Sequence, residues 1–453
     1  MCIRDSPKEN RSFFYPGVTL AAIFTKWIPA NNILNFGKVR LAYGKTGNDA
    51  SPYYVVTTYA SSPSYSNGWT YINFPINGVN AYSLSNTAGN NNLRPEMNTE
   101  FEAGLNLRFF DSRLEIDAAY YNRITDGQIL PLRIEDATGH SYQYVNFGKV
   151  RNRGVELMVN VTPVRTSKVR WDIGLNWALN RNKVLSLPGE SGDTKVNLAG
   201  IGWGGKRSIQ QYAEAGKPIG TIWSYIPQYV KDENSPHYGK MIVDNNGQPV
   251  LSDELEFTGY DTNAKWTGGV NTSISAFGLT LSGQMDMSIG GHRYMAQCEG
   301  GTFSGNGYNT IYNDRQPTVL PNTVVSDGKG GYVENTTPIY STQGGASSWQ
   351  NYYTYSTNGA GGLQYIVNRS YAKLRNVSLT WDLPEKWVRA CKLDKISLTV
   401  YGNNLLTITH KRNWFGDPEV TTGGSYDSSL GFGGTAAANP TYREVGMNLR
   451  VTF

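Results

Sequence analysis

The chain ends in the stretch Tyr442-Arg-Glu-Val-Gly-Met-Asn-Leu-Arg-Val-Thr-Phe453. Apolar side chains occupy every second position of its last nine residues: Val445, Met447, Leu449, Val451 and Phe453. In a strand this period places all of them on one face and the polar residues on the other. A strand of this kind that ends a chain on an aromatic residue is typical of an outer-membrane β-barrel. Lipid would contact the odd-numbered face, the lumen would meet the even-numbered face, and Phe453 would lie in the interfacial aromatic girdle.

The same alternation recurs upstream. Residues 101–109 and 114–120 alternate on either side of Asp111-Ser112, which predicts a hairpin, and residues 155–161 predict a further strand. The most regular segment is 169–179, where Val, Trp, Ile, Leu, Trp and Leu are separated by other residues. Its length matches the roughly nine to eleven residues that a tilted membrane strand needs. Residues 270–276, 279–289, 377–383 and 396–400 follow the same rule.

Short and long connections alternate along the chain. Phe277-Gly278 is a short turn, whereas residues 46–98, 290–367 and 408–440 are rich in Gly, Ser, Asn and Tyr and predict long loops, with a small hairpin at 53–59. Short periplasmic turns and long external loops are typical of outer-membrane barrels. Residues 219–226 predict another strand, and alternating strand direction then requires one more strand between it and 169–179, for which 208–214 is the best candidate. The resulting total is about 13 strands, an odd number, whereas bacterial barrels normally close with an even one.

The odd total predicts that further barrel strands precede this chain. Residues 1–10 also lack the charged-then-apolar layout of a signal peptide. We therefore expect residues 1–6 to be foreign to the protein and residues 7–453 to be the C-terminal part of a larger barrel. No run of 18 apolar residues predicts a membrane helix.

Composition narrows the function classes. The formal net charge of +5 over 453 residues gives no reason to expect a nucleic-acid partner. The three cysteines make no CxxC motif or disulfide framework, and the four histidines have no metal-ligand spacing. Asp244-Asn-Asn-Gly247 resembles the start of a calcium loop, with Asp253 and Glu254 beyond it, but a third carboxylate at the usual spacing is missing. A plain Asn-Gly turn is the preferred interpretation, with structural calcium as the alternative, and no other cofactor is expected.

Two motifs match serine β-lactamase elements. Ser370-Tyr-Ala-Lys373 fits S-x-x-K, and Lys45-Thr-Gly47 fits K-T-G. That chemistry needs Ser and Lys on one face of a helix, whereas here they begin a predicted strand, in which positions three apart face opposite sides. K-T-G also comes first in the chain, which is the wrong order. We therefore expect no enzymatic activity.

Several short motifs are spread over nearly the whole chain. They are Val39-Arg-Leu-Ala-Tyr-Gly-Lys-Thr-Gly-Asn48, Asn92-Leu-Arg-Pro-Glu96, Phe109-Phe-Asp-Ser-Arg-Leu114, Tyr120-Tyr-Asn122, Asn146-Phe-Gly-Lys-Val-Arg-Asn-Arg-Gly-Val-Glu156, Asn180-Arg-Asn-Lys-Val184, Gly216-Lys-Pro-Ile-Gly220, Leu374-Arg-Asn-Val-Ser-Leu379 and Tyr401-Gly-Asn-Asn-Leu-Leu406. Taken together, these motifs resemble the barrel of SusC/RagA-type TonB-dependent outer-membrane transporters, and they occur in that family's order.

The resemblance implies an antiparallel transmembrane barrel of about 22 strands, of which this chain supplies the C-terminal ones. It implies import of large nutrients, oligosaccharides or peptides, across a bacterial outer membrane. It also implies a SusD-like surface lipoprotein as partner and energy from the TonB–ExbB–ExbD complex. The family's plug and TonB box precede the barrel, and no stretch of this chain matches them, so coupling to TonB is expected to need a part absent from this sequence.

Aromatic residues of the long loops are candidate contacts to a glycan or to the partner lipoprotein; the alternative is that they pack the loops together. They are Trp203, Tyr308, Tyr312, Trp349, Tyr352, Tyr353 and Tyr355. Trp171, Trp177 and Trp381 fall within strands and are interpreted as interfacial anchors. Two rival functions stay open from the sequence: a passive porin-like channel and a soluble secreted carbohydrate-binding β protein.

Overall fold

The protein is described by a computed structural model. It covers residues 14–29, 31–62, 64–66, 71–187, 195–201, 209–341, 345–355, 362–413, 416–419, 427–428, 432–433 and 441–453. Residues 1–6, which we expect to be foreign to the protein, lie outside this part of the chain. No helix in it is long and apolar enough to cross a membrane.

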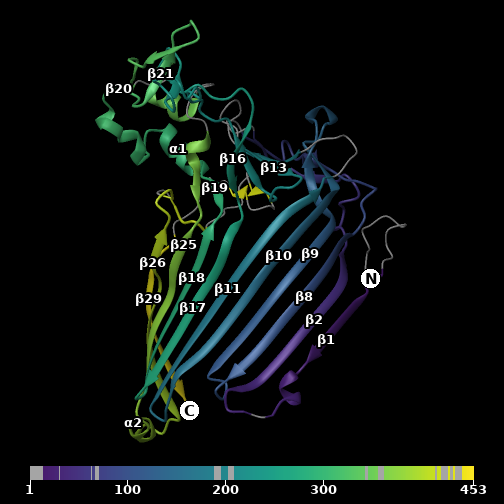
Figure 1. Cartoon of the computed structure of the whole chain (residues 1–453), viewed down its shortest axis with the longest axis vertical. Helices are drawn as coiled ribbons and strands as arrows, with labels where there is room; N and C mark the ends of the chain where they lie inside the picture. The colour runs from purple at the N-terminus through teal and green to yellow at the C-terminus, as the bar shows by residue number, and fades with distance from the viewer. Residues whose placement is uncertain are drawn as a thin grey trace.

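One large curved sheet organises the molecule (Figure 1). It has 12 strands, of which β7 (Thr87–Ala88) pairs with β10 off the main path. The path runs, in order, through β1 (Gly17–Ala22), β2 (Leu34–Asn48), β8 (Glu96–Phe109), β9 (Leu114–Arg133), β10 (Tyr142–Arg165), β11 (Val169–Ser186), β17 (Ala264–Ala276), β18 (Leu279–Gly290), β25 (Tyr371–Asp382), β26 (Lys395–Thr409) and β29 (Glu444–Thr452). Every pairing along it is antiparallel. The predicted all-β, antiparallel barrel wall is confirmed; β1 and β29 are its two open ends among the described strands.

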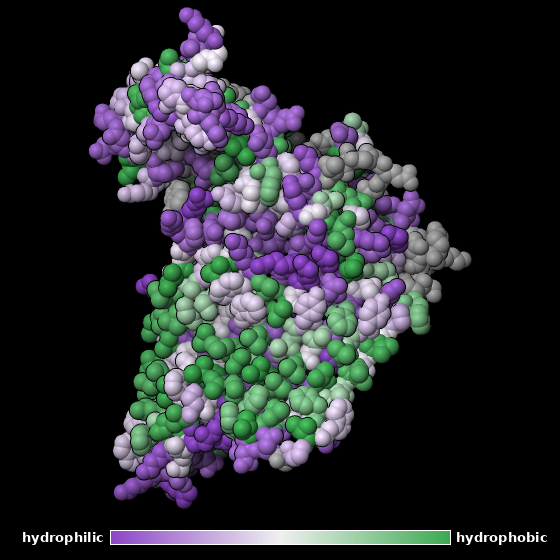
Figure 2. All heavy atoms as spheres, in the orientation of Figure 1, coloured by the Kyte–Doolittle hydropathy of each residue, from purple (hydrophilic) through white to green (hydrophobic). Residues whose placement is uncertain are grey.

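Strand register aligns the apolar positions into continuous rows. One row joins β8, β9, β10, β11, β17 and β18 through Leu107, Ile116, Val159, Leu175, Val270 and Met285. Another joins β11, β17, β18, β25, β26 and β29 through Trp171, Ile274, Leu281, Leu379, Val400 and Met447. These rows form the hydrophobic band on the face shown in Figure 2. Because the side-chain period of a strand is two, the neighbouring positions make a polar opposite face.

Two kinds of connection join these strands, as predicted. Phe277 and Gly278 link β17 to β18 in a two-residue turn in which both φ angles are positive, 52° and 82°. A short helix, α2 (Glu385–Ala390), links β25 to β26 at the same end (Figure 1). The long connections gather at the opposite end of the sheet, and we assign that end to the cell exterior.

Residues 209–214 and 219–226 do not enter the barrel wall, so the prediction of wall strands at 208–214 and 219–226 is wrong. β13 (Ile209–Glu214) and β14 (Thr221–Ser224) belong to a separate four-stranded sheet with β12 (Lys195–Ile201) and β16 (Glu256–Asp261). β11 pairs directly with β17. The strands β12–β16 fill one long external connection, so they do not change the alternating direction of the wall strands. Their apolar residues follow the alternation of barrel strands, but these residues pack against the mouth of the barrel and do not face lipid.

The small hairpin predicted at 53–59 is also misplaced. Residues 52–55 are turns, and the short strands of this loop come later, pairing β3 (Tyr59–Ser61) with β6 (Tyr82–Leu84) and β4 (Ser64–Ser66) with β5 (Tyr71–Asn73). Tyr53 has a φ of 69°, which extended pairing does not allow.

The loop predicted at 290–367 folds into a structured external unit. It contains β19 (His292–Tyr294) paired with β24 (Ile366–Asn368), helix α1 (Ala296–Phe303) and the short strands β20 (Thr318–Val319), β21 (Thr323–Ser326), β22 (Tyr332–Glu334) and β23 (Pro338–Ile339). Helical turns at Tyr308–Arg315, Asn351–Tyr355 and Gly362–Tyr365 complete it. β21 also pairs with β15 (Met241–Val243) from the preceding loop, and the unit projects beyond the sheet (Figure 1).

Candidate functional site at the mouth of the barrel

The inner face of the sheet carries a row of polar side chains. The residues paired along this row are Arg108, Glu115, Asn160, Gly174, Asn271, Gln284, Asn376, Asn403 and Glu444. A groove of about 550 Å³ lies against its middle part. Most of these side chains are carboxamides, which offer both donors and acceptors to a ligand that passes along the wall.

Ion pairs between strands occupy levels of the inner face that lie further toward the external end. The guanidinium of Arg40 on β2 donates to both carboxylate oxygens of Asp117 on β9, at 3.0 and 2.7 Å, and Asn106 on β8 donates to the same carboxylate at 2.8 Å. Arg123 pairs with Glu100 at 2.7 Å. These contacts tie three strands together while keeping the face hydrophilic, as a water-filled lumen requires.

A bulge in β25 concentrates cations near the external end of this face. Lys373 pairs with Asp286 and Asn376 with Gln284, which leaves one extra residue, Arg375, on β25. Arg375 turns back to the lumen side and binds the carboxylate of Asp286, with Nη2 at 2.8 Å from Oδ2. Bulges re-aim side chains in this way, and here the result is two neighbouring cations on one face.

The last long loop returns to these cations with two carboxylates. Lys373 is only 1% exposed, and its Nζ donates to both oxygens of Asp417, at 2.6 and 2.7 Å. Glu419 binds Lys373 and Arg375 and accepts a hydrogen bond from the Tyr371 hydroxyl at 2.8 Å. Asp417 also accepts from the Thr441 hydroxyl, so both stems of the loop meet at one carboxylate.

Charge pairing outweighs burial at Glu419. Burial of this loop carboxyl raises its pKa, but hydrogen bonds from Arg375, Lys373 and Tyr371 lower it further, so the pKa falls to about 2. The Glu419 carboxylate that helps to hold the loop at the barrel wall therefore stays ionised at any physiological pH.

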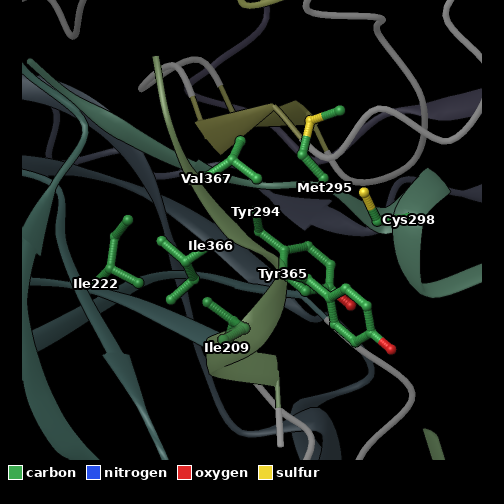
Figure 3. Packing of buried hydrophobic residues seen from close by; sticks show 8 residues of the cluster. All are labelled: Ile209, Ile222, Tyr294, Met295, Cys298, Tyr365, Ile366 and Val367. Atoms are coloured by element: carbon green, nitrogen blue, oxygen red, sulfur yellow. The ribbon is translucent and has the colours of Figure 1, made fainter. Parts of the chain in front are cut away.

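The four-stranded sheet β12–β13–β14–β16 packs against the mouth through one face. Ile209 and Ile222 of this face pack with Tyr294 and Ile366 of the paired strands β19 and β24 (Figure 3). Ala213 joins a second cluster with Val150 and Val184, at the external ends of β10 and β11. Val150 and Val184 fall on the even-numbered positions that face the lumen, so the small sheet lies against the inner side of the wall.

The opposite face of the small sheet is aromatic and basic. The rings of Tyr212 and Trp223 lie 5.5 Å apart, and Phe257 lies 5.9 Å from Trp223. Lys195 Nζ lies 4.2 Å from the Trp223 ring centroid, and Lys217 Nζ lies 4.5 Å from that of Phe257. Aromatic faces with adjacent hydrogen-bond donors suit sugar rings and extended peptides. Strand alternation could have identified Tyr212 and Trp223, but we assigned their strands to the barrel wall.

The predicted loop aromatics form a cluster in the external unit. Trp349 contacts Tyr312, Tyr352 and Tyr353 with ring centroids 5.3–5.8 Å apart. Burial raises the pKa of Tyr353 to about 12. Trp349 and Tyr352 also pack on Val243, Leu320 and Ile339. Packing of the loops therefore accounts for these two side chains.

Other predicted residues have different surroundings. Tyr308 is 83% exposed and Tyr312 is half-exposed. Trp203 and the side chain of Tyr355 lie outside the described part of the structure. Ligand or partner contact by the loop aromatics stays a prediction.

The remaining predicted residues are also located. Phe453 is 92% exposed at the turn end. Trp381 contacts Trp387 of α2, at 6.0 Å, and Trp171 Nε1 donates to Thr272 on the apolar face at 2.9 Å, so both lie near the turn end. Trp177 lies farther along β11, paired with Leu157 inside the apolar band.

The motifs considered for chemistry are occupied by structural contacts. Ser370 accepts a hydrogen bond from the Gly290 amide, and Lys373 is neutralised by the loop carboxylates. Asp244 caps a turn by accepting from the amides of Asn246 and Gln248, and Gly247 has a φ of 76°, so the Asn-Gly turn is confirmed. The described residues contain no cluster of three metal-ligating side chains. Structural calcium at Asp244 stays a prediction.

Comparisons with known proteins agree with this architecture. Residues 4–216 match the family model described as TonB dependent receptor-like, beta-barrel. TonB-dependent receptor P3 of Formosa agariphila is 24% identical over 98% of this chain and 42% of its own length. TonB-dependent receptor SusC of Bacteroides thetaiotaomicron is 29% identical over 54% of this chain and 24% of its own length.

Solved structures show the same fold. The RagAB peptide transporter superposes with a TM-score of 0.68 at 19% identity, covering 99% of this chain and 44% of that chain. The chain thus spans less than half the length of the relatives it matches. These relatives are named as receptors and transporters, and they agree with an outer-membrane location for this chain. Over nearly its whole length the chain is similar to SusC/RagA-type TonB-dependent receptors of the bacterial outer membrane, and residues 4–216 match part of their β-barrel.

Proposed function

We propose that this protein acts in TonB-dependent import of large nutrients, oligosaccharides or peptides, with this chain supplying barrel wall and external loops. The observation that carries the proposal is the division of one sheet into an apolar outer face and a continuous polar inner face. A sheet of this kind separates lipid from an aqueous path. The carboxamide row and the aromatic face of the small sheet give that path groups able to contact sugars or peptide backbones.

The proposal includes a SusD-like surface lipoprotein over the mouth and energy from the TonB–ExbB–ExbD complex. The external unit and the aromatic face lie at the end where such a lipoprotein would dock, and the RagAB transporter is named as a peptide carrier. Affinity purification of the protein from detergent-solubilised outer membrane tests the partner. We expect a lipoprotein of the SusD type to co-purify in near-equal amount.

Uptake by whole cells tests the function. The gene that encodes this chain is deleted, and cells are offered fluorescent oligosaccharides and fluorescent peptides of similar mass. We expect the deletion to abolish uptake of one of these pools, and a protonophore to abolish it equally in wild-type cells. Uptake that persists with the protonophore would instead support a passive porin-like channel.

A matched pair of substitutions tests the path itself. Asn271→Trp places bulk in the inner groove, whereas Val270→Trp places the same bulk one residue away on the lipid face. We expect Asn271→Trp to slow uptake at unchanged protein abundance and Val270→Trp to leave it unchanged. Equal uptake by both variants would contradict passage along this part of the wall.

A further inference from the structure

Four cations lie together on the outer face of the sheet, immediately above the apolar band. Arg153 on β10 pairs directly with Arg181 on β11, and Arg151 pairs with Lys183 two residues further toward the external end. Val155 and Leu179 form the next outer-face pair below them. Because side chains alternate, all four cations point away from the lumen and to the same side as the lipid-facing residues.

This arrangement is electrostatically unfavourable in the protein alone. Directly opposed side chains on antiparallel strands have Cβ atoms about 5 Å apart, and like charges there repel. Within the described ranges, no salt bridge involves Arg151, Arg153, Arg181 or Lys183. A nearby acid on this face, Asp126, pairs with other cations.

The guanidinium of Arg181 is held in position despite this repulsion. Its Nη1 donates to the backbone carbonyl oxygens of Asn180, at 3.0 Å, and Lys265, at 2.7 Å. Arg153, Arg181 and Lys183 are exposed, so their remaining donors are available to an external anion.

The four cations lie at the level where the sheet would meet the membrane surface. The row containing Arg153 continues through Asn122 and Phe101 to Tyr43, and both aromatic residues are exposed. Aromatic residues at this level mark the interface between hydrocarbon and headgroups. Figure 2 shows a strongly hydrophilic belt directly above the hydrophobic band. Since the long loops lie at this end, the belt faces the outer leaflet.

We propose that Arg151, Arg153, Arg181 and Lys183 bind the phosphate groups of a lipopolysaccharide in the outer leaflet. Arginine forks bind phosphate oxygens in a bidentate manner, and a doubly charged phosphate neutralises the opposed pairs. The lipid part of the same molecule would lie along Val155, Leu179 and the apolar rows below. The site is separate from the lumen and from the import path.

Native mass spectrometry of the protein extracted from the outer membrane in detergent tests the proposal. The protein is titrated with bisphosphorylated lipid A and with the same lipid A after enzymatic dephosphorylation. We expect only the phosphorylated form to bind tightly. The Arg153→Gln/Arg181→Gln/Lys183→Gln variant should bind phosphorylated lipid A roughly 100-fold more weakly. This factor assumes that each cation contributes about fivefold to affinity at an anionic surface.

Lys168→Gln/Lys386→Gln/Lys392→Gln removes the same charge from exposed lysines at the turn end and should bind as wild type. Equal binding of the two lipid A forms to the wild-type protein would refute the proposal, and this measurement needs no variant. Equal loss of lipid A binding in the two triple variants would also refute it. Displacement of the lipid by millimolar inorganic phosphate would identify a site for free phosphate and also overturn the lipid assignment.

Discussion

Leu175 and Asn176 are adjacent on β11, and the structure places them on opposite faces of the membrane wall. Leu175 pairs with Val159 and Val270 in an apolar row, whereas Asn176 lies beside Gly269 and near Arg40 and Asp117 on the lumen side. Replacing each of the two residues in turn by arginine tests this assignment of faces. Both variants place the same arginine side chain at adjacent positions of one strand, so their difference reports mainly the environment of each face.

The expected cost follows from the depth of Leu175. The apolar outer-face positions of β11 run from Val169 to Leu179, which is about 34 Å of strand at roughly 3.4 Å per residue. A tilt of about 40° reduces this to about 26 Å, which matches the apolar band of an outer-membrane barrel. Leu175 lies close to the middle of this span. Arginine near the midplane costs about 2–4 kcal/mol, and arginine facing the lumen costs much less.

Urea titration of each variant in phospholipid vesicles, followed by tryptophan fluorescence, measures the free energy of unfolding. We expect Leu175→Arg to lose about 2–4 kcal/mol and Asn176→Arg to lose less than about 1 kcal/mol. Equal losses, or a larger loss for Asn176→Arg, would refute the assignment of faces.

Three further outcomes are expected. Lys373→Met should cost about 3–5 kcal/mol of local stability by leaving the carboxylate of Asp417 buried without its cation, measured as faster proteolysis in the loop 410–443; unchanged cleavage would contradict this. The folded-state pKa of Glu419, about 2, is below its unfolded value, so its contribution should be full above about pH 4.3 and lost as pH falls toward 2; the same proteolysis assay across pH measures this window, and loss of protection already at neutral pH would contradict it. Phe277→Asn should stabilise the protein by about 1 kcal/mol, because Phe277 has a φ of 52°, which asparagine tolerates better; a loss of unfolding free energy in urea would show instead that the exposed ring anchors the turn at the interface.

The sequence alone determined the architecture of the wall. The alternation of segments 101–109, 114–120, 169–179 and 445–453 predicts strands with one apolar face, and the structure contains all four with that facing. This succeeds because lipid on one side and water on the other impose a strict two-residue period on every strand. The tight turn at Phe277-Gly278 was equally readable from its position between two alternating runs.

Tertiary structure alone decided what the external connections do. The segments around Tyr212 and Trp223 were predicted as wall strands, yet they form short strands of a separate sheet against the inner side of the mouth. A two-residue period indicates that one face of a strand is buried, but it does not indicate whether lipid or protein covers that face. The contact of Lys373 with Asp417 and the opposition of Arg153 to Arg181 depend on a bulge and on strand register. Local sequence does not encode such pairings, because they join residues that only the folded sheet brings together.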